Sequence, residues 1–198
     1  EERFILNKIS TYAKIKNDFL DIGCGSGEIT QEVKNMGFNT IGLDFSDKAI
    51  EIAKKKNLNA LVHDLDKGLP FEDNKFDIKL AGDVIEHIFD PIFVFKEVKR
   101  VLKPDGIFFA SIPYDLNWKV RLKTLLGISY QEGVYKAYNQ FKHHSFFSER
   151  LLRYMINNAK LRITNLHYIL GRNQKKIIKN KFLRIFSNSM IVEVINVK

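Results

Sequence analysis

Short apolar runs alternate with segments of helical spacing over the first 113 residues of the chain. Apolar runs of this length predict strands, and apolar residues that recur every three or four positions predict helices. We expect strands at 18–23, 39–44, 60–63, 76–81 and 106–112, and helices at 3–16, 27–36, 46–56 and 90–102. Such alternation is typical of a parallel sheet with helices on both faces.

The alternation breaks after Pro113 and returns near residue 148. Residues 114–146 show no strand pattern, and they are rich in aromatic side chains and poor in acids. Because they follow the fifth strand, we expect a helical lid over the edge of the sheet where ligands bind. A helix at 148–159 and strands at 161–169 and 190–197 follow, with a basic insertion at 171–186 between these two strands. The whole chain, 1–198, is predicted to form one domain.

The composition is that of a globular protein, since 45% of the 198 residues are hydrophobic. No apolar run approaches the ~18 residues that cross a membrane, and the start shows no signal-peptide pattern. Cys24 is the only cysteine, so no disulfide forms within the chain. We expect a cytoplasmic protein.

Basic residues are concentrated in the second part of the chain. Residues 1–113 carry 16 Lys and Arg against 19 Asp and Glu, a net charge of −3, whereas 114–198 carry 16 against 4, a net charge of +12. This asymmetry predicts contact with an anionic partner or surface. The alternative is a solvated lysine-rich face without a partner.

Three glycines follow the first strand in "DIGCGSGEIT", residues 21–30. A glycine at a strand-to-helix turn accepts a positive φ and lets a ligand approach the backbone. The alternative is a tight turn that binds nothing. The glycines do not fit the G-x-G-x-x-G pattern of nicotinamide dinucleotide sites, because Glu28 stands where the third glycine belongs. A glutamate at a helix N-terminus is also a poor neighbour for a pyrophosphate.

An acid stands in or just after each of the first four strands: Asp21, Asp44, Asp64 and Asp83. Each alone could be a turn or cap residue, but together they would meet at one edge of the sheet and form an acidic pocket. An acid after the second strand can accept both hydroxyls of a ribose, and one after the third can accept an adenine amino group. The four acids favour a ligand that carries positive charge.

The motifs "FLDIGCGSG", "LPFEDNKFDIKLAGDVIEHIFDP" and "VLKPDG" resemble those of class I S-adenosylmethionine-dependent methyltransferases, in the ubiquinone-biosynthesis-like, type 11 group. The resemblance is strong over residues 18–113 and continues through "HHSFFSERLLRYM" at 143–155. It implies an α/β, Rossmann-like, doubly wound sheet of seven strands in the order 3-2-1-4-5-7-6, with strand 7 antiparallel. It also implies S-adenosylmethionine as cofactor, S-adenosylhomocysteine as product, and a methyl acceptor beneath residues 114–146.

The resemblance implies a cofactor-binding role for each residue that matches a motif. The backbone of Gly23, Cys24, Gly25 and Gly27 would lie against the methionine part of the cofactor, and Asp21 would hold the ammonium of that part. Asp44 would bind the ribose hydroxyls, Phe45 would pack on the adenine, Asp64 would accept from the adenine amino group, and Leu65 would support the adenine ring. Asp83 and Val84 would form the wall of the site beside the methionyl group.

Methyl transfer from a sulfonium is an in-line displacement, so the protein mainly has to align the nucleophile, the methyl carbon and the sulfur. A base is needed only if the nucleophile is protonated when bound. The candidates for this base are His87, which follows the fourth strand, and His143 and His144. The alternative for His143 and His144 is a structural role, because they precede Ser148, which can cap the next helix. The five histidines show no metal-ligand pattern with Cys24, and we expect no metal.

We therefore expect an enzyme that methylates a small, lipid-linked or sugar-linked acceptor at oxygen. The alternatives are an RNA methyltransferase, which the basic charge favours, and a non-catalytic protein that binds the cofactor. No RNA-binding module is recognisable, and "AGDV" stands where base N-methylating enzymes carry N-P-P-[YF]. Apolar residues alternate with six cations of 171–186, which favours an anionic membrane surface over nucleic acid: Arg172, Lys175, Lys176, Lys179, Lys181 and Arg184.

Overall fold

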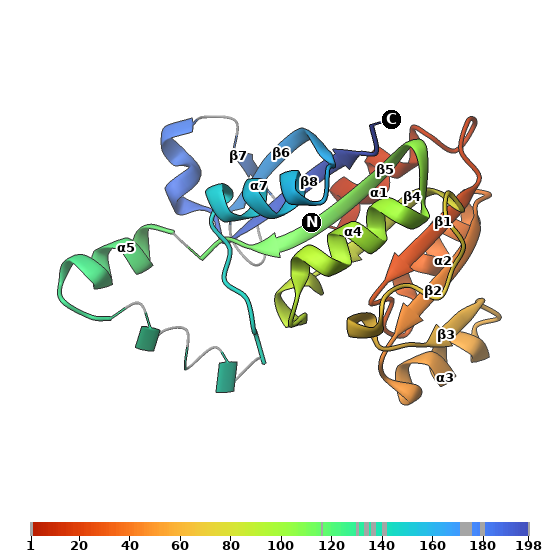
Figure 1. The fold of residues 1–198 in the computed structure, drawn as a ribbon, viewed down its shortest axis with the longest axis horizontal. Helices are drawn as coiled ribbons and strands as arrows, with labels where there is room; N and C mark the ends of the chain where they lie inside the picture. Colours follow the sequence, from red (N-terminus) through yellow and green to blue (C-terminus); the bar gives the residue numbers. More distant parts are fainter. Residues whose placement is uncertain are drawn as a thin grey trace.

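The described part of the chain forms one eight-stranded sheet with helices on both faces (Figure 1). The computed structural model describes residues 2–115, 117–129, 131, 132, 135, 138, 139, 142–170, 176–178 and 181–197. The strands are β1 (Asp18–Ile22), β2 (Asn39–Asp44), β3 (Ala60–Val62), β4 (Phe76–Gly82), β5 (Leu102–Pro113), β6 (Arg162–Leu170), β7 (Lys176–Ile178) and β8 (Ser189–Ile195). The helices are α1 (Glu2–Ser10), α2 (Glu28–Asn35), α3 (Asp47–Lys55), α4 (Pro91–Val101), α5 (Trp118–Leu125) and α7 (Glu149–Asn158), and the 3₁₀ turns are η1 (Leu65–Lys67), η2 (Ile85–His87) and η3 (Lys181–Phe186).

The strands lie in the order β3-β2-β1-β4-β5-β8-β6-β7. The predicted order is confirmed with β8 as the seventh strand, which runs antiparallel to both β5 and β6. The predicted number of seven strands is too low, because residues 176–178 add β7 at the edge, antiparallel to 168–170 of β6. This strand lies inside the lysine-rich insertion, and its three residues are too few to show an alternating pattern.

Helix α1 ends at Ser10, six residues before the predicted end. The hydroxyl of Ser10 donates to the Asn7 carbonyl at 2.9 Å, and that of Thr11 donates to the Lys8 carbonyl at 2.7 Å. Such bonds from side chain to backbone compete with the helical pattern, and turns follow up to residue 15. Tyr12 and Ala13 still pack against the core, which explains why they extend the helical spacing.

The core lies in two layers, one on each face of the sheet. Helices α4 and α7 bury Phe95 and Leu152 in the layer that contains Leu20 of β1. Helix α1 buries Ile9 in the layer that contains Phe19, the preceding residue of the same strand. Successive side chains of a strand point to opposite faces. Because both faces are covered, the strands form the nearly continuous apolar runs seen in the sequence.

The two insertions are described only in part. Helix α5 of the first begins at Asn117, whose side-chain oxygen accepts from the backbone N–H groups of Lys119 and Val120. In the second, Arg172, Lys175 and Lys179 lie outside the described residues, so membrane contact through 171–186 stays a prediction. Among the residues that the structure describes, no helix has the length and apolar character needed to cross a bilayer.

Gly27 determines where α2 begins. It is the N-cap residue of this helix, with a φ of 84° that residues with a Cβ rarely adopt. A Cβ there would also lie 2.3 Å from Leu58 Cδ1 and 3.3 Å from Ala53 Cβ. The start of α2 can therefore lie this close to α3 and the residues after it only because position 27 carries no side chain.

We expect Gly27→Ala to lower the free energy of unfolding by about 1–3 kcal/mol more than Gly37→Ala, because it adds an overpacked contact to a similar backbone strain. Gly37 is the matched control, since its φ is 95° and no atom lies within 4 Å of the position that a Cβ would take. Urea unfolding followed by circular dichroism measures both losses. Equal losses would show that Leu58 does not restrict position 27.

Candidate functional site

A cleft of about 770 Å³ opens beyond the carboxyl ends of β1, β2 and β4. Parallel α/β sheets bind their ligands at this edge, and the volume suits a small molecule. Nine of the predicted site residues line the cleft: Gly23, Asp44, Phe45, Asp64, Leu65, Asp83, Val84, His87 and His144. Asp66, Gly82, Ile88, Phe89 and Lys142 also line it, and they were not predicted.

The glycine loop after β1 is tied to the end of β2 by main-chain hydrogen bonds. The backbone N–H groups of Gly23 and Cys24 donate to the Leu43 carbonyl at 2.7 and 2.9 Å. The N–H of Gly25 donates to Asp44 Oδ2 at 2.9 Å, and the N–H of Ser46 donates to Asp44 Oδ1 at the same distance. One carboxylate thus holds both the loop and the residue that begins α3.

The Asp44 carboxylate retains the capacity to bind a ligand. An ionised carboxylate has about four lone-pair sites, and the two backbone N–H groups use two of them. Asp44 is half-buried and lines the cleft. Two acceptor sites therefore remain, which is the number that a pair of ribose hydroxyls requires.

Gly23 lets β4 approach the loop. Its φ is 73°, and a Cβ at this position would lie 2.2 Å from Val84 Cγ2. Because position 23 carries no side chain, Val84 can occupy this space at the floor of the cleft. The glycine therefore serves the close packing of the loop as well as access to its backbone.

Three further acids surround the cleft, and each also holds a turn. Asp64 Oδ1 accepts from the Asp66 N–H at 3.1 Å, and Asp66 Oδ1 accepts from the Phe89 N–H at 3.2 Å. Asp83 Oδ1 accepts from the Ser111 hydroxyl at 3.0 Å. With Asp44 they give the cleft four acids: the predicted Asp44, Asp64 and Asp83, and Asp66, which lines the cleft although Asp21 does not.

Asp21 and Cys24 do not line the cleft. Asp21 is 3% exposed and accepts a hydrogen bond from the Thr30 hydroxyl at 2.6 Å. Burial, and to a lesser degree the charge of Asp44, raise its pKa to about 6. The thiol of Cys24 faces a small apolar cluster with Ile50, and burial raises its pKa to about 12. Direct contact of either residue with a cofactor stays a prediction, as it does for Gly25 and Gly27.

Exposed aromatic rings stand at two places on the cleft. Phe45, directly after Asp44, is strongly exposed, as the predicted adenine contact requires. Phe89 is also exposed, and its ring lies 4.2 Å from that of His144 between centroids, at an interplanar angle of 38°. The rings of Tyr138 and His144 lie 5.3 Å apart. Part of the predicted lid therefore reaches the cleft beside Phe89.

Residues 142–145 dock on η2 through the main chain. The backbone N–H groups of His144 and Ser145 donate to the Glu86 carbonyl at 2.7 and 3.1 Å. His87 Nδ1 lies 3.3 Å from the Lys142 carbonyl. These contacts join the end of the first insertion to the turn after β4 and bring the three predicted histidines together.

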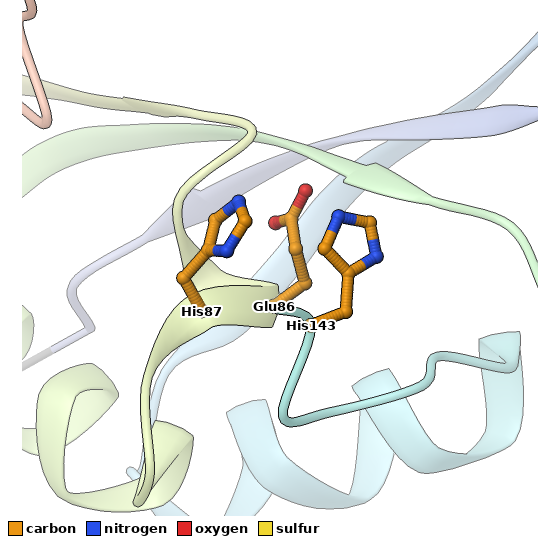
Figure 2. Close-up of side chains that lie close together, drawn as sticks. All are labelled: Glu86, His87 and His143. Carbon is orange, nitrogen blue, oxygen red and sulfur yellow. The ribbon is translucent and has the colours of Figure 1, made fainter. Parts of the chain in front are cut away.

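Figure 2 shows the side chain of Glu86 between the imidazoles of His87 and His143. The two rings lie 4.9 Å apart, edge to face. Burial, and then the nearby His87 ring, lower the pKa of His143. His87 and His144 line the cleft, whereas His143 is not among its lining residues.

The same cluster has the donor atoms of a metal site. In the described ranges, Glu86, His87 and His143 are the group of three whose ligand atoms all lie within 4.8 Å of one another. Nitrogen and carboxylate oxygen donors in this number occur in catalytic zinc sites. The sequence showed no such pattern because His143 is 56 positions from His87. The expectation of no metal stays a prediction.

Four of the five unpredicted residues had a signal in the sequence, because Gly82, Ile88 and Phe89 lie in the motif at 69–91 that carries the family resemblance. Asp66 follows Asp64 by two positions in "HDLD", so a second acid at this edge could have been noted. Phe89 and Lys142 come together only through the docking of residues 142–145 on η2, which leaves no periodic pattern.

Comparison with known proteins identifies the family of the chain. Residues 20–110 match the family described as a methyltransferase domain. The ubiquinone biosynthesis O-methyltransferase of Coxiella burnetii is 30% identical over 170 residues, which cover 78% of this chain and 69% of that protein. The protein of the same name from Pelagibacter ubique is 37% identical over 96 residues, which cover 46% of this chain and 40% of that protein. The chain thus spans between two fifths and about two thirds of the length of these relatives.

A more distant relative and two solved structures complete the comparison. The sterol 4-C-methyltransferase strm-1 of Caenorhabditis elegans is 32% identical over 133 residues, covering 61% of this chain and 40% of that protein. S-adenosylmethionine-dependent methyltransferases from Methanosarcina mazei and Archaeoglobus fulgidus share the fold, with TM-scores of 0.72 and 0.70. The Methanosarcina mazei protein is 20% identical and the match covers 96% of this chain and 97% of that chain. The Archaeoglobus fulgidus protein is 18% identical and the match covers 98% of this chain and 94% of that chain. By its sequence relatives, its sheet order and its cleft, the chain belongs to the class I S-adenosylmethionine-dependent methyltransferases.

Proposed function

We propose that this chain transfers the methyl group of S-adenosylmethionine to a hydroxyl oxygen of a small acceptor linked to a lipid or a sugar. The observation that carries the proposal is the Asp44 carboxylate, which binds the glycine loop and still offers acceptor sites in the cleft. The relatives named above support a lipid-linked acceptor, because ubiquinone and sterols are both lipids. The O-methyltransferases among them support oxygen as the methylated atom.

The residues beyond β1, β2 and β3 would hold the cofactor. Asp44 would accept from the ribose hydroxyls, Phe45 and Leu65 would pack on the adenine, and Asp64 would accept from its amino group. The buried Asp21 would face the ammonium, whose charge favours the ionised carboxylate that burial disfavours. When bound, S-adenosylmethionine supplies an activated methyl group and needs no further activation by the protein.

The acceptor would lie in the part of the cleft formed by η2 and residues 142–144. A carbonyl oxygen only accepts hydrogen bonds, so the contact between His87 Nδ1 and the Lys142 carbonyl requires the proton on Nδ1. This tautomer leaves Nε2 as an acceptor. We assign His87 Nε2 as the base that takes the proton of the acceptor hydroxyl as the oxygen attacks the methyl carbon.

The two alternatives have less support. None of the relatives named above carries an RNA substrate in its name. The RNA alternative rests on the net charge of +12 on residues 114–198, several of which lie outside the described residues. A non-catalytic cofactor-binding protein would have no need of a histidine oriented by a hydrogen bond at the cleft.

We expect Asp44→Asn to weaken the binding of S-adenosylhomocysteine by about 1.5–3 kcal/mol, since hydrogen bonds to a charged acceptor are lost. Asp47→Asn, at an exposed acid in the first turn of α3, is the control and should leave the affinity unchanged. Isothermal titration calorimetry measures both. The same affinity in both variants would show that Asp44 does not bind the cofactor.

A transfer assay tests the reaction itself. The purified protein is incubated with methyl-labelled cofactor and with lipid, sugar, small-molecule and RNA fractions from the organism that encodes it. We expect label in the lipid or sugar fraction, and a loss of about 10²-fold or more in rate for His87→Ala but not for His63→Ala, a histidine outside the cleft. Label in RNA alone would contradict the proposed acceptor.

A chelator separates the two roles that His87 could have. As a base, His87 should support transfer equally with and without EDTA. A loss of activity in EDTA that a divalent cation restores would show that the Glu86, His87 and His143 cluster binds a metal instead.

A further inference from the structure

Helix α5 has no buried residue, although half of its side chains are apolar. Trp118, Leu122, Leu125 and Leu126, the residue after its end, are 40%, 46%, 84% and 70% exposed. Figure 1 shows α5 on a segment that extends away from the sheet. Exposed apolar side chains gathered in one place mark a surface that contacts a protein, a membrane or a ligand.

The apolar side chains form one stripe along α5. Positions 118, 122, 125 and 126 are separated by four, three and one residues, so they fall on one side of a helix with 3.6 residues per turn. Lys119 and Lys123 border one edge of the stripe and Arg121 borders the other, while the helix contains no acid. An apolar stripe bordered by cations is typical of helices that lie in the surface of a membrane.

The stripe continues onto η3. The rings of Trp118 and Phe186 lie 6.2 Å apart, and Phe186 and Leu183 are themselves exposed. Turn η3 contains no acid, and it is held to the body of the protein by Arg184, which donates to Glu149 at 3.1 Å and lies over the ring of Tyr168. The exposed apolar surface therefore spans two segments far apart in the sequence and has a fixed base.

We propose that the stripe of α5, together with Leu183 and Phe186, binds the surface of a membrane that contains anionic lipid. Apolar side chains would enter the region between headgroups and acyl chains, and the lysines would contact the headgroup charge. Nucleic-acid phosphates would attract the lysines but would leave the leucines in water. The net charge of +12 on residues 114–198 complements an anionic surface and opposes association with a second, equally charged copy. The proposal goes beyond the proposed function and does not require methyl transfer.

Trp118 is the only tryptophan of the chain, so its fluorescence reports directly on the stripe. On addition of vesicles of phosphatidylglycerol and phosphatidylcholine, we expect its emission to rise and to shift to shorter wavelengths as the indole enters the membrane. Vesicles of phosphatidylcholine alone should cause a smaller change, and added salt should weaken the response to the anionic vesicles.

Two variants test the stripe by vesicle co-sedimentation, each with a matched control. Leu122→Gln, Leu125→Gln and Leu126→Gln together should remove detectable binding, whereas Ile15→Gln, Ile52→Gln and Leu61→Gln, at exposed apolar positions elsewhere, should not. Lys119→Gln with Lys123→Gln should weaken binding about 30-fold, which corresponds to about 1 kcal/mol for each lysine. Lys48→Gln with Lys54→Gln on α3 should leave it unchanged.

Wild-type protein that binds anionic vesicles no better than the leucine variant would overturn the proposal. The proposal would also be overturned if the wild type did not bind vesicles but self-associated, and if the leucine variant abolished that self-association. Salt-sensitive RNA binding by a wild type that does not bind vesicles would overturn it as well. Calorimetry with S-adenosylhomocysteine should give the same affinity for all variants, because none of them lies in the cleft. A failure of membrane binding is thereby distinguished from a failure of the proposed function.

Discussion

The carboxylate of Asp44 is the contact on which the candidate site depends. Its two oxygens accept from the backbone of Gly25 in the glycine loop and of Ser46 at the start of α3. The Ser46 side chain in turn accepts from the Ala49 N–H and caps this helix. Two segments, the glycine loop and the start of α3, are thus fixed to the end of β2 by one side chain. Because Gly23 leaves room for Val84, the residues after β4 pack directly against the same loop.

Acidic and basic side chains are concentrated in different parts of the molecule. Acids gather at the cleft, where Asp44, Asp64, Asp66 and Asp83 stand at the ends of parallel strands. This environment suits a cofactor with a sulfonium and an ammonium, and burial of Asp21 adds a carboxylate whose ionisation such a cation would favour. Cations are instead concentrated in residues 114–198, and three of them, Lys119, Arg121 and Lys123, border the exposed apolar stripe of α5. A lipid-linked acceptor would approach from this basic side.

The family resemblance implied the sheet order, whereas the strand ends, glycines and acids are local signals in the sequence that a parallel sheet brings to one edge. Strand β7 had no such signal, since three residues within a lysine-rich run do not alternate. The burial of Asp21 and Cys24 was not predictable either, because it depends on contacts with α2 and α3: Asp21 accepts from the Thr30 hydroxyl, and Cys24 packs with Ile50. Lys142 and Phe89 meet at the cleft through main-chain bonds to Glu86 that join residues more than fifty positions apart.

The membership of the chain in its family and the geometry of the Asp44 carboxylate lead to one central claim, that the cleft binds S-adenosylmethionine. Calorimetry of the unmodified protein with S-adenosylhomocysteine and with NAD tests this claim most directly. We expect the first ligand to bind with a free energy on the order of −7 to −8 kcal/mol, which corresponds to micromolar dissociation constants, and the second to give no binding heat. Binding of NAD without any response to S-adenosylhomocysteine would contradict the claim.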